Sequence, residues 1–127
     1  DGGYIYQLFG FGYLRELQLH QEAGFHPLEV LKHATVNSAT VLGQGKHLGQ
    51  VRIGYAADLV IVNGNPMADL SVLWPRNIKP LTGDESTGGI AWTIKDGRPY
   101  HAPTLLKEVR QMVKASRQDN PINYLLD

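Results

Sequence analysis

The sequence contains no cysteine in its 127 residues. This absence excludes disulfide bonds, a thiolate nucleophile and any zinc site with cysteine ligands. It does not indicate a compartment, because many exported proteins also lack cysteine. The localisation is therefore left unassigned.

An excess of charge of either sign is also lacking. Lysine and arginine together number 12, as do aspartate and glutamate. Nucleic acids and anionic membranes attract basic proteins, so we expect neither as a partner. The longest apolar run, Leu59 to Val62, is far shorter than the ~20 residues of a membrane-spanning helix. The composition favours a small or neutral substrate, or a protein partner.

Helical patterns dominate the first third of the chain. Residues 13–23 contain strong helix formers, and Gly24 follows where a left-handed residue usually ends a helix. A second helix is predicted to begin at Pro27, with a weak N-cap because His26 is neither serine nor threonine. Residues 35–43 predict a third, short helix that begins at a threonine or asparagine cap.

Strand patterns follow the helices. The β-branched run Leu59–Val62 predicts a strand that ends at the turn residues 63–66. Ile90, Trp92 and Ile94 alternate with their neighbours ahead of the turn signal Asp96-Gly97, and this pattern predicts a β-hairpin with one buried face. Residues 104–114 predict an amphipathic helix that docks on a core.

The residues taken singly predict no active site. Gly10-Phe11-Gly12 follows no strand and precedes no Lys-Ser/Thr pair, so it does not indicate a phosphate-binding loop. Asp84-Glu85 lies in a polar, Gly/Thr-rich stretch that is typical of a solvated turn. The histidines form no metal-binding pair of the H-x-H or H-E-x-x-H kind, so surface or structural roles are expected for His20, His26, His33, His47 and His101.

Two longer motifs at fixed spacing carry more information. HATVNSATVLG occupies residues 33–43, and GQVRIGYAADLVIVNGNP occupies residues 49–66. Together they resemble the C-terminal part of the amidohydrolase superfamily of metal-dependent hydrolases, especially its imidazolonepropionase-like and prolidase-like branch. The positions that match the pattern of this family are Thr35, Asn37, Ala39, Leu42, Gly43, Gly49, Val51, Gly54, Ala57, Asp58 and Leu59.

This resemblance implies an α/β fold, namely a C-terminal fragment of a (β/α)8 TIM barrel with part of a composite β-sandwich and a C-terminal helix. Residues 1–43 would be the last loop and helices of the barrel, and residues 44–103 a β-sandwich segment. Residues 104–127 would form the C-terminal amphipathic helix and tail. Within the sandwich we expect Asp58 to cap a turn and Leu59 to Val62 to fill the core.

The resemblance also implies an active-site position for Asp1. Family members have an Asp-x-Gly pattern ahead of a Leu-x-Glu-Leu helix, and this chain has Asp1-Gly2-Gly3 ahead of Leu14-Arg15-Glu16-Leu17. Asp1 would lie at the tip of the eighth barrel strand as a catalytic proton acceptor and a possible metal ligand. The loop after it would line the substrate pocket with Tyr4, Tyr6 and Phe9.

The implied function is hydrolysis of a carbon–nitrogen bond, in an amide, a peptide-like or a cyclic amide substrate, by a metal-activated water. The cofactor would be a divalent metal in a longer parent protein, with zinc as the expected ion. Its other ligands would lie before Asp1, so the fragment alone is expected to bind no metal and to be inactive. A missing N-terminal barrel segment, or another chain, would cover an apolar face. The alternative is a non-catalytic β-sandwich module for binding, scaffolding or regulation.

Overall fold

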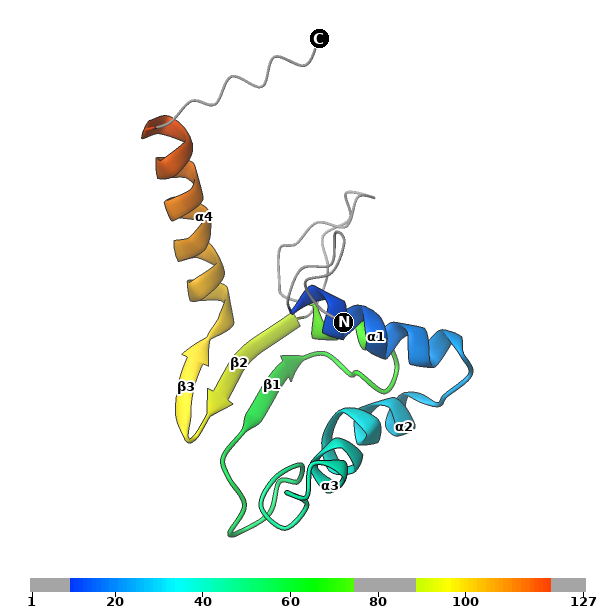
Figure 1. Ribbon diagram of the computed structural model, residues 1–127. Coiled ribbons are helices and arrows are strands. Elements are labelled where there is room, and N and C mark those ends of the chain that lie inside the picture. Colours follow the sequence, from blue (N-terminus) through cyan, green and yellow to red (C-terminus); the bar gives the residue numbers. More distant parts are fainter. Residues whose placement is uncertain (1–9, 75–88, 120–127) are drawn as a thin grey trace.

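The computed structural model describes residues 10–74 and 89–119. Short helices come first, three antiparallel strands follow, and a long helix comes last (Figure 1). This mixture of helices and a small sheet agrees with the expected combination of α and β structure. No helix within the two described ranges is long and apolar enough to cross a membrane.

The first two helices form close to where the sequence predicts them. α1 spans Phe11–Glu22 and α2 spans Pro27–Lys32, with Gly24 between them at a φ of 98°. The predicted weak cap of α2 is wrong. The His26 Nδ1 atom accepts a hydrogen bond from the Leu28 N–H at 3.3 Å, and a Glu29 carboxylate oxygen accepts one from the His26 N–H at 2.9 Å. An imidazole nitrogen therefore fills the capping role that a hydroxyl usually has.

The third helix is not separate from the second. α2 continues into a π-helical turn, η1 (His33–Asn37), and then into α3 (Ser38–Val41). The expected threonine or asparagine cap is absent from this described segment. Instead, the Thr35 hydroxyl donates to the Leu31 carbonyl at 2.7 Å, and the Thr40 hydroxyl donates to the Val36 carbonyl at 2.8 Å. Both hydroxyls donate to carbonyls of the preceding helical turn and do not accept from backbone N–H groups as a cap would. The helical segment therefore continues without a break.

A small apolar core joins the helices to the 3-10 turn at residues 70–73. Leu17 of α1, Val30 of α2 and Leu70 are buried against each other. Leu70 begins η2 (Leu70–Leu73), a 3-10 turn whose N-cap is Asp69. The side chains packed around these three are Leu14, Leu31, Ala34 and Leu73. Because η2 also contacts β1 and β2, it connects the helices to the sheet.

The sheet has the strand order β1-β2-β3 and is antiparallel throughout. Its strands are β1 (Leu59–Asn63), β2 (Gly89–Lys95) and β3 (Arg98–His101). The turn residues Asp96 and Gly97 have φ values of 49° and 76°, as the predicted type I′ hairpin requires. The hairpin face is less buried than predicted, because Trp92 remains 38% exposed.

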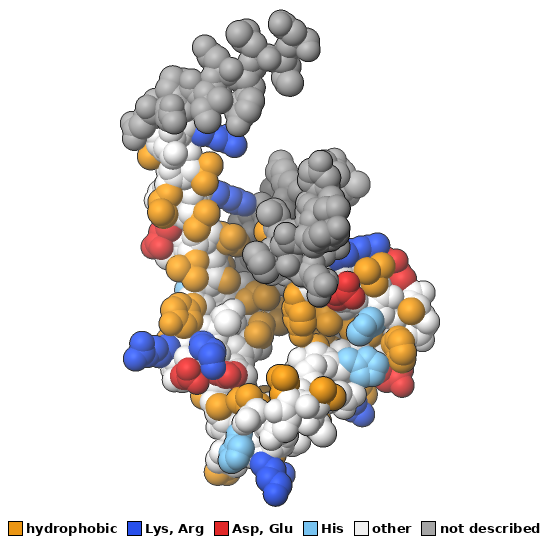
Figure 2. Space-filling view, viewed as in Figure 1, with side chains coloured by type: hydrophobic (Ala, Val, Ile, Leu, Met, Phe, Trp, Pro, Cys, Tyr) orange, Lys and Arg blue, Asp and Glu red, His pale blue; other side chains and the backbone are white. Residues whose placement is uncertain are grey.

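The last helix, α4, spans Ala102–Asp119 and is longer than the predicted 104–114. It contacts β2 and β3, and the rest of it projects away from the sheet (Figure 1). The prediction that its apolar stripe docks on a core is wrong for the described residues. Figure 2 shows hydrophobic side chains exposed along it, and Met112 is 70% exposed. The other exposed apolar residues of α4 are Leu105, Val109 and Val113.

Candidate functional site

The predicted site residues Asp1, Tyr4, Tyr6 and Phe9 lie outside the residues that the structure describes. The described chain starts directly after them, at Gly10, and α1 begins at Phe11. The Phe11 ring stacks on the Trp74 ring, with centroids 6.0 Å apart and an angle of 29° between the planes. This contact brings the start of α1 to the end of η2. Sequence analysis did not predict it, because the two aromatics are far apart in the chain.

The densest polar cluster joins Asp58 to the hairpin turn. An Asp58 carboxylate oxygen accepts a hydrogen bond from the Asp96 N–H at 2.9 Å, and the other lies 2.8 Å from the Lys95 ammonium. The Lys95 ammonium also lies 3.1 Å from Asp96. In addition, the Gly97 N–H donates to the Ala57 carbonyl at 3.1 Å. The expectation that Asp58 caps a turn is confirmed, and the turn is that of the β2–β3 hairpin.

These contacts change the protonation equilibria of both partners. The Asp96 N–H and then the Lys95 ammonium lower the pKa of Asp58 below its ordinary value. The Asp58 carboxylate, and then Asp96, raise the pKa of Lys95. Both shifts favour the charged forms of the two partners. The hydrogen bond and the ion pair of the Asp58 carboxylate thus hold the hairpin turn.

The histidines make structural contacts. The rings of His20, Phe25 and His33 cluster, with centroids 5.1 to 5.9 Å apart. Nδ1 of His20 is buried and has no hydrogen-bond partner among the described residues. His101 Nδ1 lies 2.8 Å from the Thr104 hydroxyl. Across residues 10–74 and 89–119, no group of three or more His, Cys, Asp or Glu side chains could hold a metal ion.

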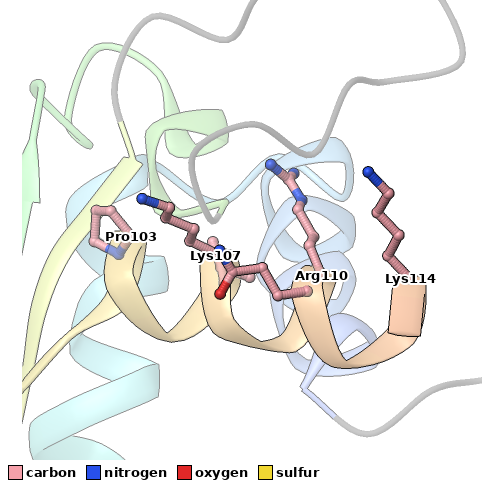
Figure 3. Close-up of a pocket in the computed structure, with 6 residues that line it drawn as sticks. Pro103, Lys107, Arg110 and Lys114 are labelled. Atoms are coloured by element: carbon pink, nitrogen blue, oxygen red, sulfur yellow. The ribbon is translucent and has the colours of Figure 1, made fainter. Parts of the chain in front are cut away.

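Two shallow hollows of about 360 Å³ each occur on the described surface. One lies along α4, where Lys107, Arg110 and Lys114 extend from the same side of the helix (Figure 3). The other lies on the loop before β1 and is lined by Val51, Arg52 and Tyr55, among others. Neither hollow has a carboxylate or an imidazole among its described lining residues. Neither therefore offers, among these lining residues, the carboxylate or imidazole that most often serves as a general base or metal ligand.

The loop before β1 carries part of the longer sequence motif. Gly49 has a φ of 86°, and a Cβ atom there would lie 2.9 Å from both Ala39 Cβ and the Thr35 carbonyl oxygen. Thr35, Ala39 and Gly49 are all motif positions, so the motif encodes the close approach of this loop to the helix. Val51 and Ile53 lie further along the loop and are 89% and 103% exposed.

The sequence profile of the Amidohydrolase family matches residues 10–100, which is most of the chain. This chain belongs to the amidohydrolase family. The match includes the loop contact at Gly49 and the contacts of the Asp58 carboxylate with Lys95 and the Asp96 N–H, which we call the Asp58 clamp. Both features of this amidohydrolase chain therefore lie within the region that defines its family.

Known relatives and solved structures resemble this amidohydrolase chain over only part of their length. Ochratoxinase of Aspergillus niger is 42% identical over 59 residues, which are 45% of this chain and 12% of the relative. A crystal structure of a Xaa-Pro dipeptidase with bound methionine in the active site has a TM-score of 0.57 and 26% identity, over 75% of this chain and 20% of that one. A second amidohydrolase structure has a TM-score of 0.51 and 31% identity, over 69% and 19%. The chain thus spans about an eighth to a fifth of the length of these proteins.

Proposed function

We propose that this chain is the C-terminal part of a metal-dependent amidohydrolase that hydrolyses a carbon–nitrogen bond in an amide, peptide-like or cyclic amide substrate. The observation that carries the proposal is the family match over residues 10–100. The Xaa-Pro dipeptidase and ochratoxinase similarities support a hydrolase and suggest two substrates to assay. In this proposal residues 10–43 complete a (β/α)8 barrel, and the β1–β3 sheet belongs to a composite β-sandwich.

Asp1 is the proposed catalytic residue. Its carboxylate would accept a proton from the attacking water and pass that proton to the leaving nitrogen. Tyr4, Tyr6 and Phe9 would surround the substrate, because loops at the strand ends of such barrels form the pocket. The position of α1 supports this assignment, since α1 begins directly after these residues, as a barrel helix follows its strand and loop.

A divalent metal, with zinc as the expected ion, would supply an activated water in the longer protein. The described residues do not fit such an ion, because no group of three or more of them could ligate it. Its ligands, apart from a possible contribution by Asp1, would have to come from other sequence. We therefore expect the 127-residue chain to be inactive by itself and to bind no catalytic metal.

Apolar side chains are exposed on α4 and on the loop before β1. This exposure supports the proposal that another protein surface covers them. We propose that the N-terminal barrel segment of the longer protein, or another chain, covers them. A small-molecule or peptide-like substrate is the other partner, and neither a nucleic acid nor a membrane is proposed.

The decisive variant is Asp1→Asn in the longer protein. Loss of the proton acceptor should reduce hydrolysis by about 10²–10⁴-fold, while metal content and folding stay near normal. The assay would use Xaa-Pro dipeptides and ochratoxin, with metal content measured by elemental analysis and folding by circular dichroism. Asp96→Asn, at another aspartate, is the matched control. Wild-type turnover in Asp1→Asn would remove Asp1 from the mechanism.

A non-catalytic binding, scaffold or regulatory module is the second candidate. The Asp58 clamp favours it, because it stabilises the sheet by contacts entirely within this chain. Intact-mass measurement and size-exclusion chromatography of the native material distinguish the two proposals. A folded monomer near 14.1 kDa without metal would support the module, and a longer metal-containing protein would support the enzyme.

A further inference from the structure

The asparagines of the described chain differ in the residue that follows them. Asn37 precedes Ser38, Asn63 precedes Gly64, and Asn65 precedes Pro66. An asparagine side chain can be attacked by the backbone nitrogen of the next residue, and glycine obstructs this attack least because it has no side chain. The three positions therefore differ in their expected chemical stability.

The Asn63–Gly64 bond lies on the surface, and the packing around it favours glycine at position 64. Asn63 is the last residue of β1, pairs with Gly89 and is exposed, as is Gly64. Gly64 has a φ of 130°, and a Cβ atom at this position would lie 2.9 Å from Cγ1 of Val72. Packing against η2 thus requires glycine directly after an exposed asparagine.

We propose that Asn63 is a site of spontaneous deamidation, which would make it the first of the described asparagines to be modified. The Gly64 nitrogen attacks Cγ of Asn63, so that a new C–N bond forms and the Cγ–Nδ2 bond breaks. The proton of the Gly64 N–H leaves with the departing ammonia. Water then opens the five-membered imide, giving aspartate or isoaspartate according to which carbonyl it attacks.

The two other asparagines provide internal comparisons. Asn65 cannot react in this way, because Pro66 has no N–H. At Asn37 the helical backbone holds the next residue, since the Ser38 N–H donates to the Thr35 carbonyl. Of these three bonds, only Asn63–Gly64 combines exposure, a following glycine and a position outside a helix.

Isoaspartate at residue 63 would add one methylene group to the main chain and one carboxylate to the surface. The change would lie between β1 and the turn that carries Leu70, which is part of the small core. We therefore expect the modified chain to pair less well at Asn63 and Gly89 and to unfold more readily than the unmodified chain.

The test is incubation of the 127-residue chain at mildly alkaline pH, with and without urea, followed by proteolysis and mass spectrometry. Replacement of an amide by an acid would be located by fragment ions that separate Asn63 from Asn65, and labelling by an isoaspartyl methyltransferase would identify isoaspartate. Asn63→Gln is the matched variant, because it keeps an amide but would have to form a larger ring. Gly64→Ala is unsuitable, since its Cβ would clash with Val72.

Without urea, conversion at Asn63 should exceed that at Asn37 several-fold, and Asn63→Gln should abolish most of the signal. In urea, conversion at Asn37 should rise as its helix is lost, while Asn65 should stay unmodified in both conditions. An unmodified Asn63 without urea, or equal conversion at Asn37 and Asn63, would overturn the proposal.

Discussion

Among single residues, Asp58 makes the contacts that join the start of β1 to the hairpin turn. Its carboxylate accepts a backbone N–H and pairs with the Lys95 ammonium. The N–H fixes the position of the turn, whereas the exposed ion pair adds little by itself because water screens it. The backbone hydrogen bond therefore explains how an aspartate directly before β1 positions a turn that is distant in sequence.

The lowered pKa of Asp58 predicts a pH dependence of stability. Because the folded-state pKa lies below the unfolded value, the stabilisation is present above the ordinary carboxyl range and is lost as the pH falls through the folded-state pKa. The raised pKa of Lys95 has the opposite dependence. Its contribution is present below the ordinary lysine pKa and is lost as the pH rises through the folded-state value.

We expect Asp58→Asn to lower the melting temperature modestly at neutral pH and to reduce the loss of stability on acidification. Thermal melts from neutral pH to about pH 3, near the ordinary aspartate pKa, would measure both effects. Glu108→Gln, at an exposed position of α4, is the control. A variant that loses as much stability as the wild type on acidification would show that the clamp does not act through the Asp58 carboxylate.

Gly49→Ala is expected to destabilise the chain by about 2–4 kcal/mol, because a positive φ and a steric clash act together. The new Cβ would lie 2.9 Å from the Thr35 carbonyl oxygen and from Ala39 Cβ. Gly54→Ala is the matched control, since Gly54 has a similar φ of 87° but open space around it. Gly54→Ala should lower the free energy of unfolding by only about 1–2 kcal/mol. Urea denaturation of the two variants would measure the difference, and equal losses of stability would contradict a steric role for Gly49.

Among the helices, Val30 of α2 and the apolar stripe of α4 lie in opposite environments. Val30 of α2 is fully buried between α1 and η2, whereas the apolar stripe of α4 is largely exposed. Both helices have an amphipathic sequence, so the pattern indicates a face that is able to pack. The amphipathic pattern does not indicate whether the surface that packs against this face belongs to the described residues.

This contrast predicts unequal effects of substitution. Val30→Ala should cost about 2–3 kcal/mol of unfolding free energy, because it leaves a cavity in the small core. Met112→Lys, on the exposed stripe, should change it by less than about 0.5 kcal/mol. Urea titrations of both variants would measure this difference. A large loss in Met112→Lys would mean that α4 is packed in solution more closely than in the structure.

At the scale of the whole molecule, the exposed apolar surface should make the isolated chain self-associate. The contributing residues lie on α4 and on the loop before β1, where Val51 and Ile53 are almost completely exposed. The charges also balance at 12 each, so electrostatic repulsion between copies is weak. Analytical ultracentrifugation should show association that increases with concentration.

The double variant Val109→Lys with Met112→Lys should weaken this association, because it places charge within the apolar stripe. Lys107→Gln with Lys114→Gln, on the polar side, is the matched control and should not weaken it. A strictly monomeric wild-type chain at high concentration would contradict the prediction, and it would weaken the case for a missing barrel segment.

The local elements with short-range signals could be predicted from the sequence alone. Pro27 begins α2, Gly24 separates the first two helices, and Asp96-Gly97 forms the hairpin turn, because each of these residues has conformational limits that do not depend on distant contacts. The family also followed from the sequence, since the spacing of Thr35, Asn37, Gly49 and Asp58 is itself a sequence property.

Which surfaces meet could not be predicted from the sequence. The structure shows that His26 caps α2, that Phe11 stacks on Trp74, and that the Asp58 carboxylate binds the hairpin turn. These contacts depend on where distant residues lie in space, and periodicity carries no such information. For the same reason an amphipathic pattern predicted α4 but not its exposed face.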